Sequence, residues 1–229
     1  MLTLDDVTLV RGDFRLRASL DLPPGLTAVI GPSGGGKSTL LSAIAGFEEP
    51  VKGRILWDGR DLRGLVPGDR PVTMLFQDHN LFPHLTVAQN VGLALAPRLR
   101  LTVRQQAVVE DVLTSVGLEG LGDRKPAALS GGQVGRAALA RTLLADRPVV
   151  LLDEAFAALG PALRHEMLGL VRDRLASQGR TVVVVTHDPQ DARTFADGIV
   201  FVDDGVAHPT QATDIFFATP SQAARAYLG

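Results

Sequence analysis

A glycine-rich run that ends in lysine and serine is the first part of this sequence that could perform chemistry. Residues 31–38 read GPSGGGKS and satisfy the spacing G-x-x-x-x-G-K-[ST]. Glycines let successive backbone N–H groups turn toward one anion, and a helix that begins near Lys37 adds the positive end of its dipole. We therefore expect a phosphate-binding loop rather than an ordinary glycine-rich turn, with Lys37 holding the β- and γ-phosphates of a nucleotide. The candidate nucleotide-binding residues are Gly31, Pro32, Ser33, Gly34, Gly35, Gly36, Lys37, Ser38 and Thr39.

Two adjacent carboxylates end a short apolar run later in the chain. Residues 149–152 read VVLL, and Asp153 and Glu154 follow them. Open α/β sheets place ligands at the carboxyl ends of their strands, where adjacent residues point in opposite directions. We expect Asp153 to address Mg²⁺ together with the Ser38 hydroxyl, and Glu154 to act as general base toward a water in line with the γ-phosphate. The alternative is that both acids only solvate a strand end, but the phosphate loop favours the catalytic interpretation.

His187 closes the next apolar run, residues 181–185. By the same reasoning it is expected at the same edge of the sheet, within reach of the γ-phosphate. The remaining histidines have no comparable placement and are assigned no role; they are His79, His84, His165 and His208.

Alternating and continuous apolar patterns predict the strands that position these residues. The alternation between Leu2 and Leu22 indicates antiparallel strands, and Leu26 to Ile30 indicates the strand before the phosphate loop. Residues 148–152 and 181–185 are continuous apolar runs, as in strands buried on both faces of a parallel sheet. Further strands are expected at residues 54–57, before the turn pair at 58–59, and at residues 199–202, before a closing hairpin.

Helical periodicity supplies the other elements. A helix is expected over residues 39–46, and another carries Leu163, Met167, Leu170, Val171 and Leu175 on one face. Residues 87–145 show a helical pattern throughout, in which Thr102 and Gln105 form a capping box. The apolar face that follows this cap is expected at Ala107, Val108, Val112 and Val116.

Composition narrows the class of protein. The 229 residues are 45% hydrophobic, enough for a sizeable core, and the net charge of −2 gives no cationic field for nucleic acid. The absence of cysteine excludes disulfides and thiolate metal sites. The N-terminus lacks the pattern of a secretory signal, and no apolar run approaches the ~20 residues that cross a bilayer. Any membrane role is therefore expected to come through a partner.

Residues 129–133, LSGGQ, complete a set of motifs that resembles the ATP-binding subunits of ABC transporters. The resemblance covers nearly the whole chain, because the phosphate loop, Gln77, this signature, the carboxylates and His187 follow in the family's order. It implies an α/β fold with a P-loop NTPase core and mixed sheet, an N-terminal antiparallel β subdomain and an inserted α-helical subdomain. The expected division is a single domain over residues 1–229, with the helical insertion at about 86–146 and a C-terminal hairpin and helices at about 198–229.

The resemblance also implies ligands and partners. ATP and Mg²⁺ are the expected cofactors, with Gln77 joining Ser38 and Asp153 around the metal. Ser130, Gly131, Gly132 and Gln133 would bind the nucleotide of a second copy, because Ser130 and Gln133 form a capping box that leaves glycine amides unfilled at a helix start. A homodimer of ATPase subunits is therefore expected on integral membrane permease subunits. Its place is the cytoplasmic face of the bacterial inner membrane, with a periplasmic solute-binding protein as an indirect partner.

Within that family, residues 71–77, 81–91 and 161–164 look most like bacterial thiamine importers. The implied function is ATP-driven uptake of thiamine or its phosphates. Iron, polyamine or other small-solute importers are the alternative, although they usually carry an additional C-terminal β domain for which this chain lacks the length. An exporter cassette, a non-transport protein of translation or DNA repair, and a degenerate regulatory cassette without hydrolysis are further alternatives.

Five positions depart from the family pattern. Val134 and Gly135 replace a polar pair after the signature, Ala155 replaces a proline, and Gly160 replaces an aspartate that reaches across the dimer. We expect Gly160 to slow or loosen ATP hydrolysis. Arg11 stands where an aromatic side chain normally stacks on adenine, so its guanidinium or the ring of Phe14 is expected to take that role.

Overall fold

The computed structural model describes residues 1–229, and eleven strands join in one mixed sheet. The strand order is β5-β4-β1-β2-β10-β9-β3-β8-β7-β6, with β11 paired to β9. The strands are β1 (Leu2–Arg11), β2 (Phe14–Leu22), β3 (Gly25–Ile30), β4 (Lys52–Trp57), β5 (Arg60–Asp61), β6 (Val72–Leu75), β7 (Val149–Asp153), β8 (Thr181–Val185), β9 (Gly198–Asp203), β10 (Val206–Ala207) and β11 (Gln211–Ala212). The α-helices are α1 (Lys37–Ala45), α2 (Val87–Gly92), α3 (Val103–Ser115), α4 (Gly131–Leu144), α5 (Pro161–Arg174), α6 (Pro189–Phe195), α7 (Thr213–Ala218) and α8 (Gln222–Leu228). Three 3₁₀ turns are η1 (Pro67–Asp69), η2 (Pro126–Ala128) and η3 (Ala176–Gln178).

Five parallel strands, β9-β3-β8-β7-β6, form the centre of the sheet. β3, β7 and β8 occupy the three continuous apolar runs of the sequence, and β8 is buried along its whole length. Because these strands are parallel, the residues that follow them emerge at one edge. That edge receives the phosphate loop after β3, Glu154 after β7 and His187 after β8.

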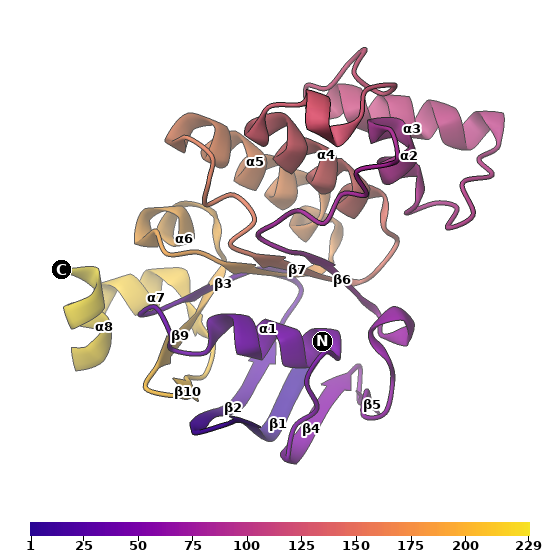
Figure 1. Cartoon of the computed structure of the whole chain (residues 1–229). Helices are drawn as coiled ribbons and strands as arrows, with labels where there is room; N and C mark the ends of the chain where they lie inside the picture. The colour runs from indigo at the N-terminus through magenta and orange to yellow at the C-terminus, as the bar shows by residue number, and fades with distance from the viewer.

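The two faces of the parallel strands are covered differently (Figure 1). α1 lies between them and the antiparallel strands β1, β2 and β4, in a cluster that joins Leu40, Leu41 and Ile44 to inward residues of both sets of strands. α4, α5 and α6 cover the opposite face, in a cluster that also takes in Phe216 of α7 and Ala224 of α8. The expected mixed sheet with antiparallel N-terminal strands is confirmed.

α2, α3 and α4 gather around a smaller apolar cluster of their own. The expected capping box is present at α3, where Gln105 N donates to Thr102 Oγ1 and Thr102 N donates to Gln105 Oε1. The expected apolar face is wrong at Ala107 and Val108, which are exposed, whereas Val112 packs against this cluster and Val116 is buried, as expected. The buried side chains are Val109, Leu113 and Val116.

The C-terminal part returns to the sheet and then to its helical face. β9 and β10 form the hairpin expected after residue 202, and α7 and α8 follow. The division into one domain with a helical insertion at about 86–146 stays a prediction. None of the helices combines the length and the apolar character that a bilayer-spanning segment needs.

Candidate active site

The loop between β3 and α1 requires glycine at two positions. At Gly31, with a φ of 145°, a Cβ atom would lie 2.0 Å from the carbonyl oxygen of Val202. At Gly36, with a φ of 107°, a Cβ atom would lie 2.8 Å from Phe14 Cζ. Gly36 is also the N-cap of α1 and has no side chain to bond the N–H groups of the first turn. These groups are therefore left for an anion.

The side chain of Lys37 folds back over the phosphate loop and does not extend into solvent. Its side chain is buried, and Nζ donates to the carbonyl oxygens of Gly31 and Pro32, at 2.8 Å each. Burial lowers the pKa of Lys37, whereas the charges of Glu154 and Asp153 oppose that shift. The ammonium thus lies within the phosphate loop, next to two carboxylates.

Ser38 and Asp153 meet at the start of α1. Ser38 Oγ donates to Asp153 Oδ1 at 3.0 Å, which joins the phosphate loop to the end of β7. Burial raises the pKa of Asp153, the hydrogen bond from Ser38 opposes this, and the neighbouring charge of Glu154 adds to the increase. A hydroxyl and a carboxylate at hydrogen-bond distance are oxygen donors of the kind that Mg²⁺ prefers.

Glu154 lies between two cavities. One, of about 320 Å³, is lined by residues 33, 34 and 36–39 of the phosphate loop and the start of α1, by Glu154, and by Arg11 and Phe14. The other, of about 20 Å³, lies between Glu154 and His187. The structure therefore brings Glu154 to the phosphate loop and also places it beside the expected histidine.

Arg11 and Phe14 occupy the outer wall of the 320 Å³ cavity. The Arg11 side chain is exposed and lies 3.8 Å from Glu48, whereas Phe14 is half-buried against Gly36. Both residues therefore line the same cavity as the phosphate loop.

Gln77 and the signature residues do not line this cavity. Gln77 is exposed beyond the end of β6, the strand that pairs with β7. Ser130 caps α4 in the expected capping box, since Gln133 N donates to Ser130 Oγ and Ser130 N donates to Gln133 Oε1. The start of α4 is exposed, and its glycine amides have no ligand from their own chain's phosphate loop.

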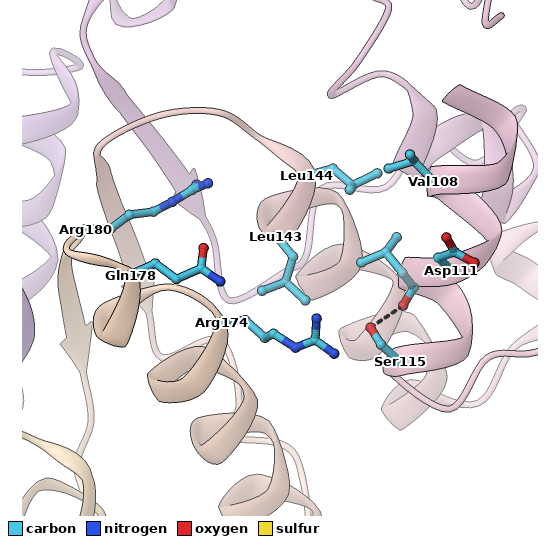
Figure 2. Close-up of a pocket in the computed structure, with 9 residues that line it drawn as sticks. Val108, Asp111, Ser115, Leu143, Leu144, Arg174, Gln178 and Arg180 are labelled. Atoms are coloured by element: carbon cyan, nitrogen blue, oxygen red, sulfur yellow. Dashed lines mark hydrogen bonds between the residues drawn. The ribbon is translucent and has the colours of Figure 1, made fainter. Parts of the chain in front are cut away.

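A further cavity, of about 330 Å³, lies between α3, the end of α4 and the end of α5 (Figure 2). Figure 2 shows Arg174, Gln178 and Arg180 on one side and Val108, Asp111 and Ser115 on the other. Arg180 precedes β8, so this cavity is at the opposite edge of the sheet from the phosphate loop. It contains none of the residues predicted to perform chemistry.

Sequence reasoning missed two side chains that hold the segment around His187. Tyr227 Oη donates to the carbonyl oxygen of His187 at 3.2 Å, and Arg164 pairs with Asp188. Arg164 lies within residues 161–164, which resemble the family, but no local pattern indicates its role, and none marks Tyr227. Both contacts join residues far apart in the chain, so only the fold reveals them.

Comparisons with known proteins agree with this architecture. Residues 17–157 match the family model described as ABC transporter. Over the full length of both chains, this chain is 59% identical to the thiamine import ATP-binding protein ThiQ of Cereibacter sphaeroides and 50% identical to that of a Ruegeria species. A dimeric structure of the ATP-binding cassette MJ0796 bound to ADP and Pi superposes with a TM-score of 0.81 at 30% identity, covering 93% of this chain and 99% of that one.

The resemblance seen in the motifs is thus confirmed along the chain. The family model covers more than half of it, and the relatives match it from end to end. On this evidence the chain belongs to the ABC transporter family.

Proposed function

We propose that this chain is the ATP-hydrolysing subunit of an importer for thiamine. The observation that carries the catalytic part is the meeting of Lys37, Ser38, Asp153 and Glu154 at one edge of the sheet, where Lys37, Ser38 and Glu154 line a cavity of about 320 Å³. The relatives whose names specify thiamine import match the chain over its full length, which supports the cargo.

The residues present fit Mg²⁺. Ser38 Oγ and Asp153 Oδ1 lie 3.0 Å apart, and Gln77 follows the neighbouring strand. We assign these three residues to the metal and its water shell. When bound with ATP, the metal neutralises charge on the β- and γ-phosphates.

The chain's own residues divide the remaining work. The phosphate-loop amides and Lys37 bind the β- and γ-phosphates, and Arg11 or Phe14 contacts the adenine. Glu154 takes a proton from the attacking water, or orients that water, and His187 holds the γ-phosphate from the next strand. The cavity that both Glu154 and His187 line supports this division.

The signature residues serve a second copy of the chain. The start of α4 is exposed and capped by its own side chains, so Ser130, Gly131, Gly132 and Gln133 present amides to an anion held elsewhere. The dimeric MJ0796 cassette supports this assembly. We place the dimer on permease subunits at the cytoplasmic face of the inner membrane, with a periplasmic solute-binding protein delivering the cargo to those subunits.

Glu154→Gln in the assembled transporter tests both parts of the proposal. The amide keeps the size of the side chain but cannot accept the proton, so ATP binding is retained while turnover falls about 10²- to 10⁴-fold. Uptake of radiolabelled thiamine into cells should fall with it, and iron and polyamine uptake should not change. Undiminished ATPase activity would contradict the role of Glu154, whereas a loss of iron or polyamine uptake alone would contradict the cargo.

A further inference from the structure

We propose that Arg164 of α5 is a positioning residue for His187, acting on the backbone beside that histidine. The inference rests on the role proposed above for His187. It concerns a side chain that does not line the cavity of the phosphate loop.

Arg164 bridges two carboxylates that flank the start of α6. Its guanidinium donates to Asp188 Oδ2, and its Nε lies 2.7 Å from Asp191 Oδ2. The Arg164 side chain is only 15% exposed, and that of Asp191 is 11% exposed. Ion pairs in such a desolvated setting are costly to break from one side, because the remaining charge loses its partner.

Asp188 follows His187 directly in the chain, so a restraint on Asp188 also limits the movement of His187. Asp188 Oδ1 caps α6 by accepting from Gln190 N at 2.9 Å, and Asp188 N donates to Thr186 Oγ1 at 3.1 Å. The peptide between His187 and Asp188 is therefore fixed by its own loop and by Arg164. Tyr227 Oη donates to the carbonyl oxygen of His187 and provides a second restraint on this peptide.

The 20 Å³ cavity connects this group to the proposed chemistry. Arg164, Asp191, Glu154 and His187 all line it. Its volume suits about one water molecule. Burial raises the pKa of Asp191, and the charge of Arg164 opposes this. Without Arg164, the Asp191 carboxylate would lose its closest countercharge beside His187.

α5 carries Arg164 next to a contact with the signature helix. A Cβ atom at Gly132 of α4 would lie 3.1 Å from Leu163 Cδ2. Leu163 and Arg164 are adjacent, so one turn of α5 touches the residues proposed to meet a second copy and also the loop of His187.

The test is Arg164→Met in the assembled transporter, which keeps much of the side-chain length and removes the charge. Loss of position by about 1 Å costs up to about 10²-fold in rate, so we expect kcat to fall about 10- to 100-fold. The KM for ATP should stay within about twofold, because the phosphate loop is not altered.

Arg172→Met is the matched control on the same helix. Arg172 also joins α5 to the segment around α6, with Nη1 donating to the carbonyl oxygen of Phe195 at 3.1 Å, but at the end of α6 away from His187. We expect its kcat to stay within about twofold of the unaltered protein. An equal loss of kcat in both variants would overturn the proposal, since it would mean that any break between these helices suffices.

A double-mutant cycle distinguishes positioning from general support of the fold. If Arg164 acts through His187, Arg164→Met should cause no further loss of kcat in a His187→Ala background. Losses that multiply, or an unchanged kcat in Arg164→Met alone, would overturn the inference. If His187→Ala itself kept full kcat, the proposed role of His187 would fail first, and with it the inference. Should Arg164→Met not fold, Asp188→Asn replaces it, with a smaller loss that must likewise vanish in the His187→Ala background.

Discussion

Glu154 adopts a backbone conformation that side chains rarely occupy. Its φ is 47°, immediately after the last residue of β7. Such left-handed positions in residues other than glycine are uncommon and gather at functional sites, where the surrounding structure enforces them. Here the turn separates Glu154 from the strand direction that Asp153 still follows, so the two adjacent acids reach different places. This geometry supports separate roles for the two carboxylates.

Asp153 is a carboxylate whose charged form is disfavoured by burial in the folded chain. Because its pKa is raised in the folded chain, the folded state binds a proton more tightly than the unfolded state does. The associated stability is fully present below the ordinary pKa of aspartate and is lost as the pH rises through the raised value. At neutral pH, and without Mg²⁺, the ionised side chain therefore lowers the stability of the chain.

Asp153→Asn should accordingly raise the Tm of the ligand-free chain at pH 7. The substitution removes a proposed metal ligand, so we expect the ATPase activity of the chain to be lost. The difference from the unaltered chain should shrink as the pH falls below the raised pKa. Thermal unfolding monitored by circular dichroism at several pH values checks this, with the exposed Asp173→Asn as control. A lower Tm for Asp153→Asn at pH 7 would show that the carboxylate stabilises the chain instead.

At the scale of elements, a buried arginine forms hydrogen bonds with the carboxyl end of α1, the helix that follows the phosphate loop. Arg70 is 1% exposed, and its Nη1 donates to the last-turn carbonyl oxygens of Ala43 and Ile44, at 2.8 and 3.2 Å. Its Nη2 donates to Glu49 at 2.7 Å. Arg70 therefore caps the carboxyl end of α1, where a cation is favourable.

Arg70→Met should lower the free energy of unfolding by about 3 kcal/mol, because carbonyl groups of α1 lose a buried donor. Urea denaturation measures this change. The exposed Arg63→Met serves as control and should stay within about 0.5 kcal/mol of the unaltered chain. Equal, small effects of both substitutions would mean that water replaces the Arg70 contacts.

Gly135 allows α4 to approach the segment after Gln77. A Cβ atom there would lie 2.9 Å from His79 Nε2, and Arg141 of the same helix donates to the carbonyl oxygens of His79 and Asn80. The departure from the family pattern at Gly135 is thus matched by the ring of His79. Burial lowers the pKa of His79, which favours the neutral ring in this position.

Gly135→Ala should therefore fail to give the ~1 kcal/mol that alanine usually adds within a helix. The gain should appear when His79→Ala is present as well, and urea denaturation of the four proteins of this cycle measures the coupling. Gly169→Ala in α5, where a Cβ atom meets no neighbour, is the control and should stabilise in either background. The same gain from Gly135→Ala with and without His79 would refute the packing argument.

The sequence was sufficient where local chemistry decides the structure. The phosphate loop, the strands β3, β7 and β8, and the capping boxes at Thr102 and Ser130 each depend on neighbouring residues, and all were predicted. Ala107 and Val108 were wrongly assigned to the buried face of α3, because Val108, Val109, Val112 and Leu113 offer two competing apolar stripes. Arg164 and Tyr227 could not be predicted, since their partners are distant in the chain and only the assembled sheet brings them together.

At the scale of the whole molecule, Gly160 stands at the start of α5 where the family pattern has an aspartate. Its φ is −62°, no side chain caps α5, and a Cβ atom there would meet no neighbour. An aspartate would therefore fit here without strain. The backbone conformation at this position does not require glycine. Its effect is expected between copies.

Gly160→Asp should raise ATP turnover severalfold in the assembled transporter if the missing carboxylate limits the dimer. Gly160→Ser is the matched control, because serine caps a helix about as well as aspartate and adds only a few tenths of a kcal/mol over glycine, without reaching a partner. Turnover and urea denaturation are measured for both. Unchanged turnover in Gly160→Asp, or the same increase in Gly160→Ser, would contradict the dimer explanation.

The bond from Tyr227 to the carbonyl oxygen of His187 gives the final helix a genetic consequence. Ala224 is buried in the main apolar cluster, and Tyr227 and Leu228 pack against it. A stop codon that arises just after the codon for Ser221 would delete only a short tail, yet it would free the loop that carries His187. Such an allele should behave as a loss of function, like a missense change in the phosphate loop, rather than as a harmless trimming.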